Sequence, residues 1–381
     1  MKYEWIKNVA EISSDYTIIK FNRDFNQKIE PNTLPKNLTT LIFSDFNQKI
    51  EPNTLPENLT TLIFGSGFTQ KIKPNTLPKN LTTLKFGVYF NQKIEPNTLP
   101  KNLTTFTFGY CFNQKIEPNT LPENLTTLIF GNKFSQIIEP NTLPKKLTTL
   151  IFGRGFNQKI EFNSLPENLT TLTFGDDFNQ KIEPNTLPKN LTTFTFGFYF
   201  NQEIEPNTLP GNLTSLTLGW IFNQKIEPNI LPKNLTSLTF GKFFDQKIEP
   251  NILPKNLTTL TFGRNFSQNI NSEILPPNLK NINFNWECIE YRFSSNHFHH
   301  NSEMINNIPN YYNVKIFLKR NSYIICALKW PIHIVNYVEN KWSSKIYEIQ
   351  DKYIHPIHGS ITILINKHTY QPYSSAKSAL K

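Results

Sequence analysis

A single 22-residue unit repeats through most of this chain, and it constrains the fold more than any other feature. Its consensus is F-N-Q-K-I-E-P-N-T-L-P-K-N-L-T-T-L-T-F-G-x-x. The first phenylalanine of the unit stands at Phe25, Phe46, Phe68, Phe90, Phe112, Phe134, Phe156, Phe178, Phe200, Phe222, Phe244 and Phe266. The first interval is 21 residues and the following ten are 22 each. A fixed period of this length predicts a solenoid, in which each unit buries its apolar face against its neighbours.

Each unit should supply one short strand. The segment L-T-T-L-x-F is rich in β-branched residues, and its apolar positions alternate with the variable one. In the unit that starts at Phe46, we expect Leu59, Leu62 and Phe64 to point inward. The next phenylalanine, the isoleucine four residues later and the leucine before the second proline complete six apolar columns.

The remainder of each unit should contain no helix. Two prolines within P-N-T-L-P require an extended or polyproline-like backbone there. We expect the glycine after each strand, from Gly65 to Gly263, to permit a turn with positive φ. The predicted fold is therefore mainly β, a solenoid with a parallel β-sheet and a helix-free outer face.

Three domains follow from where the repeat begins and ends. Residues 1–24 form an N-terminal cap with one degenerate strand, because I-K-F at 19–21 aligns with L-I-F at 41–43. Residues 25–284 form the solenoid of about twelve repeats. Residues 285–381 form a C-terminal cap or small α+β module, with strands at 314–318 and 361–365, a helix at 332–350 and a loose tail from 370.

One polar row is invariant within the chain. The glutamine after F-N occurs in every unit, at Gln27, Gln48, Gln70, Gln92, Gln114, Gln136, Gln158, Gln180, Gln202, Gln224, Gln246 and Gln268. The preceding asparagine is replaced only by Thr69, Ser135, Asp245 and Ser267. Short hydrogen-bonding side chains at this position indicate local bonds to backbone. We predict a structural ladder of amides between repeats and weigh it above a ligand-binding row.

Two other repeated features could be interpreted as a charged binding face and as glycosylation sites, but the sequence favours a structural explanation for both. The lysine and glutamate of Q-K-I-E form neighbouring rows of opposite charge, which are typical of a solvated face. Asn-Leu-Thr/Ser occurs ten times and matches the glycosylation sequon. A structural asparagine before each strand explains that repetition without glycosylation.

Composition argues against several classes of protein. The net charge is +10, of which five lie over the repeats and five from residue 285 onward, without the dense basic cluster of a nucleic-acid binder. The three cysteines are far apart, and the N-terminus lacks the apolar segment of a signal peptide. The most apolar stretch, 323–338, is too short and polar to cross a membrane. We therefore expect a cytoplasmic monomer.

The motif F-N-Q-x-I-x-P-N-T-L-P-x-N-L-T-x-L-x-F resembles the FNIP repeat, a 22-residue leucine-rich-like repeat abundant in social amoebae and in giant viruses of amoebae. The match covers about 260 of the 381 residues. The resemblance implies a right-handed, leucine-rich-repeat-like solenoid that presents a binding surface. In the wider family the repeats can be joined to an F-box, which would make the protein a substrate adaptor for ubiquitin ligases. Here the lead of about twenty residues is too short for an F-box, so such a role would require a partner.

The candidate binding surface is the pair of variable positions after each strand glycine, which we call the rim. Rigidly held loops with exposed aromatics and arginines favour protein recognition. The candidate residues are Tyr89, Tyr110, Arg154, Phe198, Tyr199, Trp220, Phe243 and Arg264. The outward position of each strand varies as well. The opposing interpretation is that unconstrained loop positions drift and that aromatics fold back onto the core.

No catalytic motif or cofactor motif is present in the sequence, so we predict a protein-binding scaffold that is not an enzyme. A metal or catalytic site in the C-terminal block is the alternative, based on Cys288, Cys326 and the histidines at 297–300. Their spacing matches no zinc pattern. A recently expanded array without a fixed partner is the third possibility.

Overall fold

The computed structural model describes residues 5–268, 270, 273–287, 313–320, 323–328, 353–355, 359–361 and 363–364. The chain divides into two compact units, Met1–Leu213 and Thr214–Lys381. The boundary falls inside the repeat array, and each unit is described by itself below.

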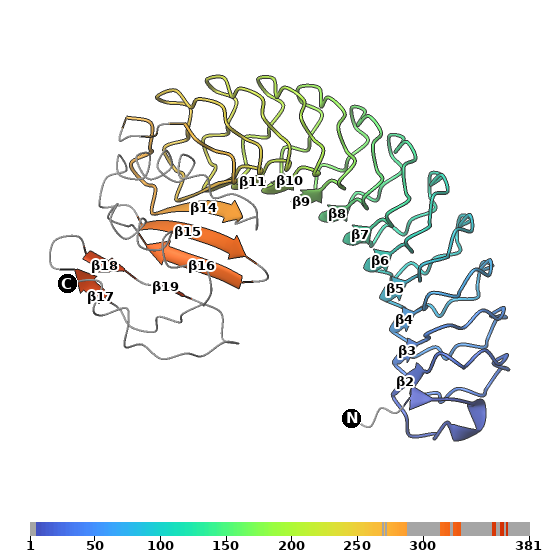
Figure 1. Cartoon of the computed structure of the whole chain (residues 1–381). Helices are drawn as coiled ribbons and strands as arrows, with labels where there is room; N and C mark the ends of the chain where they lie inside the picture. The colour runs from blue at the N-terminus through green and yellow to red at the C-terminus, as the bar shows by residue number, and fades with distance from the viewer. Residues whose placement is uncertain are drawn as a thin grey trace. The chain divides into compact units, whose positions relative to one another are not determined.

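The first unit is a ladder of short parallel strands (Figure 1). It begins with β1 (Trp5–Ile6), a 3-10 helix (Val9–Glu11) and β2 (Ile18–Phe21). One strand per repeat follows: β3 (Thr40–Ile42), β4 (Thr61–Ile63), β5 (Thr83–Lys85), β6 (Thr105–Thr107), β7 (Thr127–Ile129), β8 (Thr149–Ile151), β9 (Thr171–Thr173) and β10 (Thr193–Thr195). Each pairs in parallel with the strand before it, and β2 pairs Ile19 with Leu41 of β3, the alignment expected for a degenerate strand.

The second unit continues the pattern with β11 (Ser215–Thr217), β12 (Ser237–Thr239), β13 (Thr259–Phe262) and β14 (Asn281–Glu287), all parallel. Beyond them, β15 (Asn313–Arg320) pairs in parallel with β14, β16 (Tyr323–Leu328) is antiparallel to β15, and β19 (Ile363–Leu364) is antiparallel to β16. A separate hairpin joins β17 (Tyr353–His355) and β18 (Gly359–Ile361). The helix predicted at 332–350 and the tail from 370 lie outside the described residues.

The six predicted apolar columns form the core. Leu59, Leu62 and Phe64 are at most 1% exposed, and the next repeat contributes Phe68 and Ile72 at 0% and 5%. The leucine before the second proline is buried in each described repeat as well. The fold is therefore a mainly β parallel solenoid of about twelve turns with an essentially helix-free outer layer, as the period predicts.

Within each unit, phenylalanine rings of successive repeats stack on one another in the core. The ring centroids of Phe86, at the end of one repeat, and Phe90, at the start of the next, are 3.7 Å apart, and Phe90 lies 6.4 Å from Phe112 one repeat further on. Aromatic pairs at these separations stabilise beyond the area they bury. Because a ring such as Phe90 contacts Phe68 in the preceding repeat as well as Phe112 in the next, a repeat does not bury its core alone.

A tight turn with a left-handed asparagine closes the outer face of eleven repeats. In E-P-N-T, the backbone N–H of Thr120 donates to Glu117 O at 3.2 Å, and Asn119 has a φ of 62°. Proline followed by a residue with positive φ is typical of a type II turn. The same left-handed asparagine occurs in eleven repeats, including the one in which Phe162 replaces the proline. The asparagine is thus the constant element of this turn.

The strand glycines differ from the prediction. Gly65, Gly87, Gly109, Gly131, Gly153, Gly175, Gly197, Gly241 and Gly263 all have a φ outside the left-handed region, so the expectation of a positive φ is wrong for them. A Cβ on Gly131 would instead lie 1.7 Å from the carbonyl oxygen of Gly109 in the preceding repeat. Glycine is required because the backbones of successive repeats approach closely here.

Side chains before the strands bond to backbone between repeats. Asn102 Nδ2 donates to Lys79 O at 3.0 Å, and Thr104 Oγ1 donates to Thr82 O at 3.2 Å. The same two bonds recur along the array. The recurring Asn-Leu-Thr therefore has a structural cause, because both side chains bond to backbone carbonyls of the preceding repeat and the threonine bonds are half-buried.

Candidate binding surface

The rim is a second backbone ladder beside the sheet. At eight rim loops, the second variable residue donates its backbone N–H to the carbonyl of the first variable residue in the preceding repeat. Cys111 bonds to Val88 O, Lys133 to Tyr110 O and Tyr199 to Asp176 O, each at 2.8 Å. Further bonds of this kind start at Tyr89, Gly155, Asp177, Phe243 and Asn265. The loops are therefore held in register while their side chains vary.

The predicted rim residues differ in exposure. Tyr89 is 59% exposed, Tyr110 44%, and Tyr199 and Phe243 42% each. Arg154 is also exposed, whereas Phe198, Trp220 and Arg264 are half-buried. The exposed tyrosines do not fold back onto the core, which is already filled by the repeat phenylalanines.

Several of the rim candidates contact neighbours on the rim itself. Arg154 Nε lies 3.8 Å from Asp176 Oδ2 and 3.9 Å from Asp177 Oδ1 of the next rim loop. The ring of Phe198 contacts that of Tyr199 edge-on, with centroids 4.8 Å apart. Arg154 is therefore a weaker candidate for an anchor than the tyrosines, because a partner would have to compete with two carboxylates.

The candidate rim residues fall into two sets, one in each compact unit. In the first unit, Val88, Tyr89 and Tyr110 occupy consecutive rim loops, and Phe198 and Tyr199 form a pair in a later loop. In the second unit, Lys242 Nζ lies 5.0 Å from the ring centroid of Trp220 and 5.6 Å from that of Phe243. Each unit therefore carries its own aromatic section of the rim.

The glutamine row is tied to the asparagine row of the preceding repeat. Gln114 Nε2 donates to Asn91 Oδ1 at 3.2 Å, and the same oxygen accepts the backbone N–H of Asn113 at 2.9 Å. Where Ser135 replaces the asparagine, its Oγ takes the same role for Gln158 at 3.3 Å. The equivalent bond is present for Gln70, Gln136, Gln180, Gln202, Gln246 and Gln268. Ten of the twelve glutamines are half-buried, and Gln27 and Gln92 are exposed.

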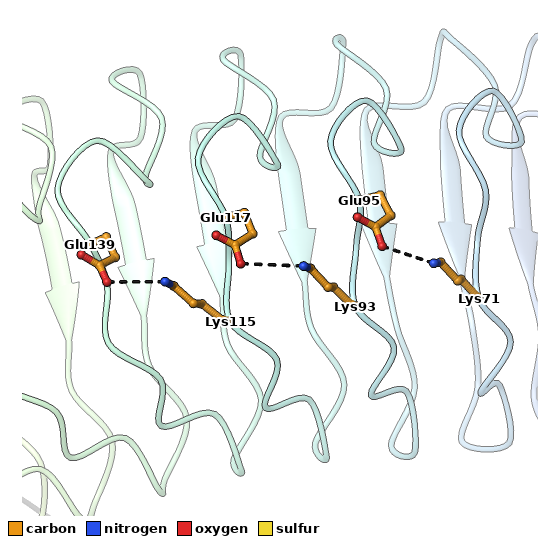
Figure 2. Close-up of polar contacts among 6 residues, drawn as sticks. All are labelled: Lys71, Lys93, Glu95, Lys115, Glu117 and Glu139. Carbon is orange, nitrogen blue, oxygen red and sulfur yellow. Dashed lines mark hydrogen bonds and ion pairs between the residues drawn. The ribbon is translucent and has the colours of Figure 1, made fainter.

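The charged rows on the outer face are paired across or within repeats. Figure 2 shows Lys71 beside Glu95, Lys93 beside Glu117 and Lys115 beside Glu139, at 3.2, 3.7 and 3.6 Å. Four other lysines pair within their own repeat: Lys28, Lys159, Lys225 and Lys247. Lys181 bonds to Glu205 at 2.7 Å, and the hydrogen bond and charge of that carboxylate raise the pKa of Lys181. Such mutual pairing leaves this face little net charge with which to attract a ligand.

Sequence reasoning missed one feature of the outer face. Ile137 and Phe162, in consecutive repeats, are 52% and 63% exposed. They replace the lysine and the first proline of the consensus, so the departures are visible in the sequence. They are exposed apolar side chains away from the rim, so a binding experiment must separate their contribution from that of the rim.

The alternative C-terminal site receives no support from the described residues. No group of three or more His, Cys, Asp or Glu in the described part of the chain could hold a metal ion. Cys288 and the histidines at 297–300 lie outside the described residues, while Cys326 belongs to β16. Among the described residues there is also no helix of the length and apolarity that a bilayer crossing requires.

Comparison with known families decides the classification. The FNIP repeat model matches residues 11–46, 25–67, 46–87, 68–111, 112–155, 156–199, 200–243 and 244–286. This chain belongs to the FNIP repeat family. The matched ranges include every strand from β2 to β13. The repeat that defines the family is thus the same unit that contributes one strand, one rim loop and one proline–asparagine turn.

A solved structure shares this architecture. CroV588, described as a novel circular leucine-rich-repeat protein, is 44% identical to this chain and aligns with a TM-score of 0.71. The alignment covers 82% of this chain and 48% of CroV588, so this chain spans about half the length of its structural relative. A search of curated proteins found no match.

Proposed function

We propose that this FNIP repeat protein is a non-enzymatic scaffold in the cytoplasm that binds a protein partner through its rim. The observation that carries the proposal is the rim ladder, in which backbone bonds fix loops whose side chains are variable and exposed. Recognition residues are commonly placed on loops held by a rigid scaffold. A partner would meet a surface ordered in advance, which reduces the entropy lost on binding.

The aromatic residues supply the expected anchors. Tyr89 and Tyr110 are exposed on consecutive loops, although burial of their rings would remove apolar area from water. Exposed aromatic side chains are enriched among residues that dominate binding energy. The paired lysines and glutamates of the outer face offer no comparable unsatisfied group.

A paired affinity capture tests the proposal. The bait is either the wild-type chain or the variant with Tyr89→Ser, Tyr110→Ser, Tyr199→Ser and Phe243→Ser. The matched control carries Ile137→Ser and Phe162→Ser, which remove the exposed apolar side chains of the outer face. Thermal melts verify that all three baits are equally folded.

The proposal predicts a protein captured by the wild type and by the outer-face control but not by the rim variant. Identical capture by all three baits, or loss only with the outer-face control, would refute a rim-based interaction.

A further inference from the structure

One continuous part of the first unit lacks acidic residues on its sheet face and rim. From β4 to the rim loop after β8, the outward strand positions and the rim positions contain no aspartate or glutamate. We call these positions the acid-free surface: residues 61, 63, 66, 67, 83, 85, 88, 89, 105, 107, 110, 111, 127, 129, 132, 133, 149, 151, 154 and 155. Acidic rim residues occur on both sides of it, at Asp45 and Asp176.

The acid-free surface carries basic groups that lack partners. Lys85, at the outward end of β5, and Lys133, on the rim, are exposed. Neither forms an ion pair with any residue that the structure describes. By contrast, Lys71 and Lys93 on the outer face each contact a glutamate. The charges of Lys85 and Lys133 are therefore available to a ligand.

The exposed tyrosines lie between these two lysines in the order of the repeats. Tyr89 follows Lys85 in the same repeat, and Tyr110 occupies the next rim loop. The backbone N–H of Lys133 donates to Tyr110 O at 2.8 Å, which fixes the following loop beside it. Two exposed tyrosines of the rim thus lie between an unpaired lysine at the end of β5 and an unpaired lysine on the rim.

We propose that the acid-free surface binds an extended acidic polypeptide segment. Its carboxylates would pair with Lys85 and Lys133, while an apolar side chain between them would contact Tyr89 and Tyr110. This inference rests on the proposed function and specifies the chemistry of the partner. The chain's net charge of +10 would also attract an acidic segment and speed its association.

The charge density favours a polypeptide over a nucleic acid. Two unpaired lysines across five repeats are sparse compared with the basic stripe that follows a phosphate backbone. The outward strand positions of the acid-free surface are Thr or Ile, apart from Lys85. Such a low content of charged residues is typical of protein interfaces.

The experiment is selection from a random dodecapeptide display library on the immobilised full chain. Retained peptides that also bind the chain with Lys85→Glu and Lys133→Glu are then removed. The matched control is Lys79→Glu/Lys101→Glu, which makes the same change in net charge in the loops that enter β5 and β6. One enriched peptide is synthesised with a fluorescent label, and its affinity is measured by anisotropy for all three chains. A labelled twelve-nucleotide thymidine strand is measured in parallel.

We expect the enriched peptides to be acidic with one or two apolar residues. Affinity should fall about tenfold or more in Lys85→Glu/Lys133→Glu and less than about threefold in the control. The reason is that loss of a direct contact lowers the affinity more than loss of long-range attraction does. Neutral or basic peptides, no enrichment, equal losses in both variants or tighter binding of the thymidine strand would overturn the proposal. A rim-dependent protein found by affinity capture alongside any of these results would leave the proposed function standing and remove only this inference.

Discussion

Lys71 Nζ lies 3.2 Å from Oε1 of Glu95, one repeat further along the chain, and not beside a glutamate of its own repeat. The cause is in the sequence, because Lys73 stands where that glutamate would be. Lys93 and Lys115 then also pair one repeat ahead. The shift ends where Ile137 replaces a lysine, and Lys159 pairs within its own repeat again. Two substitutions of the consensus thus determine the register of the ion pairs between them.

The first prediction concerns this register. A double-mutant cycle of Lys93→Ala and Glu117→Ala should give a coupling free energy of about 0.2–1 kcal/mol, because both groups are partly exposed. The matched cycle of Lys93→Ala with Glu95→Ala, within one repeat, should give a coupling near zero. Urea denaturation at low and high salt provides the measurement, and the coupling should decrease with salt. Stronger coupling within the repeat would contradict the shifted register.

The second prediction concerns the close approach of backbones at the strand glycines. Gly131→Ala should lower the free energy of unfolding by at least about 2 kcal/mol, because its Cβ would lie 1.7 Å from Gly109 O and force successive repeats apart. Gly211→Ala is the control, since a Cβ there would meet no atom within 4 Å, and it should change stability by less than about 1 kcal/mol. Urea midpoints and slopes would be compared for both. Equal effects would show that conformational freedom, and not close approach, selects these glycines.

The third prediction concerns buried hydroxyl groups. Thr98 is 4% exposed, and its Oγ1 has no hydrogen-bond partner in the described structure, as is true of Thr54, Thr76, Thr120 and Thr142. Thr98→Val keeps the shape and removes the unpaired hydroxyl, so the free energy of unfolding should stay constant or rise by up to about 1 kcal/mol. Ile230 and Ile252, both buried, occupy the equivalent position in two repeats.

Ser164→Ala is the control for that experiment. Ser164 Oγ donates to Glu161 O at 2.8 Å, so its removal should lower the free energy of unfolding by about 1 kcal/mol. If Thr98→Val is as destabilising as Ser164→Ala, the threonine hydroxyl has a partner, such as a buried water molecule.

The repeat made the architecture predictable from the sequence. Periodic positions such as Leu59, Leu62 and Phe64 have the same surroundings in every repeat, so the inward and outward faces could be assigned by comparison within the chain. The prolines correctly excluded a helix from the outer layer. The physical reason is that every repeat of a solenoid has the same local structure. Each repeat therefore provides a further check of which positions face the core.

The role of the glycines and the rim ladder were not predictable in the same way. A glycine that recurs from repeat to repeat is compatible with a positive φ or with close packing, and Gly131 shows the second. The rim bonds join backbone groups, such as Lys133 N to Tyr110 O, and leave no requirement on residue type. Because the rim side chains vary, the sequence carries no signal that the rim backbone is held by regular hydrogen bonds. The choice of binding surface depends on a partner, which the repeat pattern does not encode.

Site-specific photo-crosslinking tests most directly whether the rim contacts a partner. Tyr89 and Tyr110 would each be replaced by a photoreactive phenylalanine analogue, and Phe162, which is 63% exposed on the outer face, would carry it as the control. Each chain would be irradiated in cytosolic extract after matched thermal melts. A rim-binding scaffold predicts the same crosslinked protein from positions 89 and 110 and none from position 162. Crosslinking from position 162 alone, or equally from all three positions, would contradict the assignment of the rim as the binding surface.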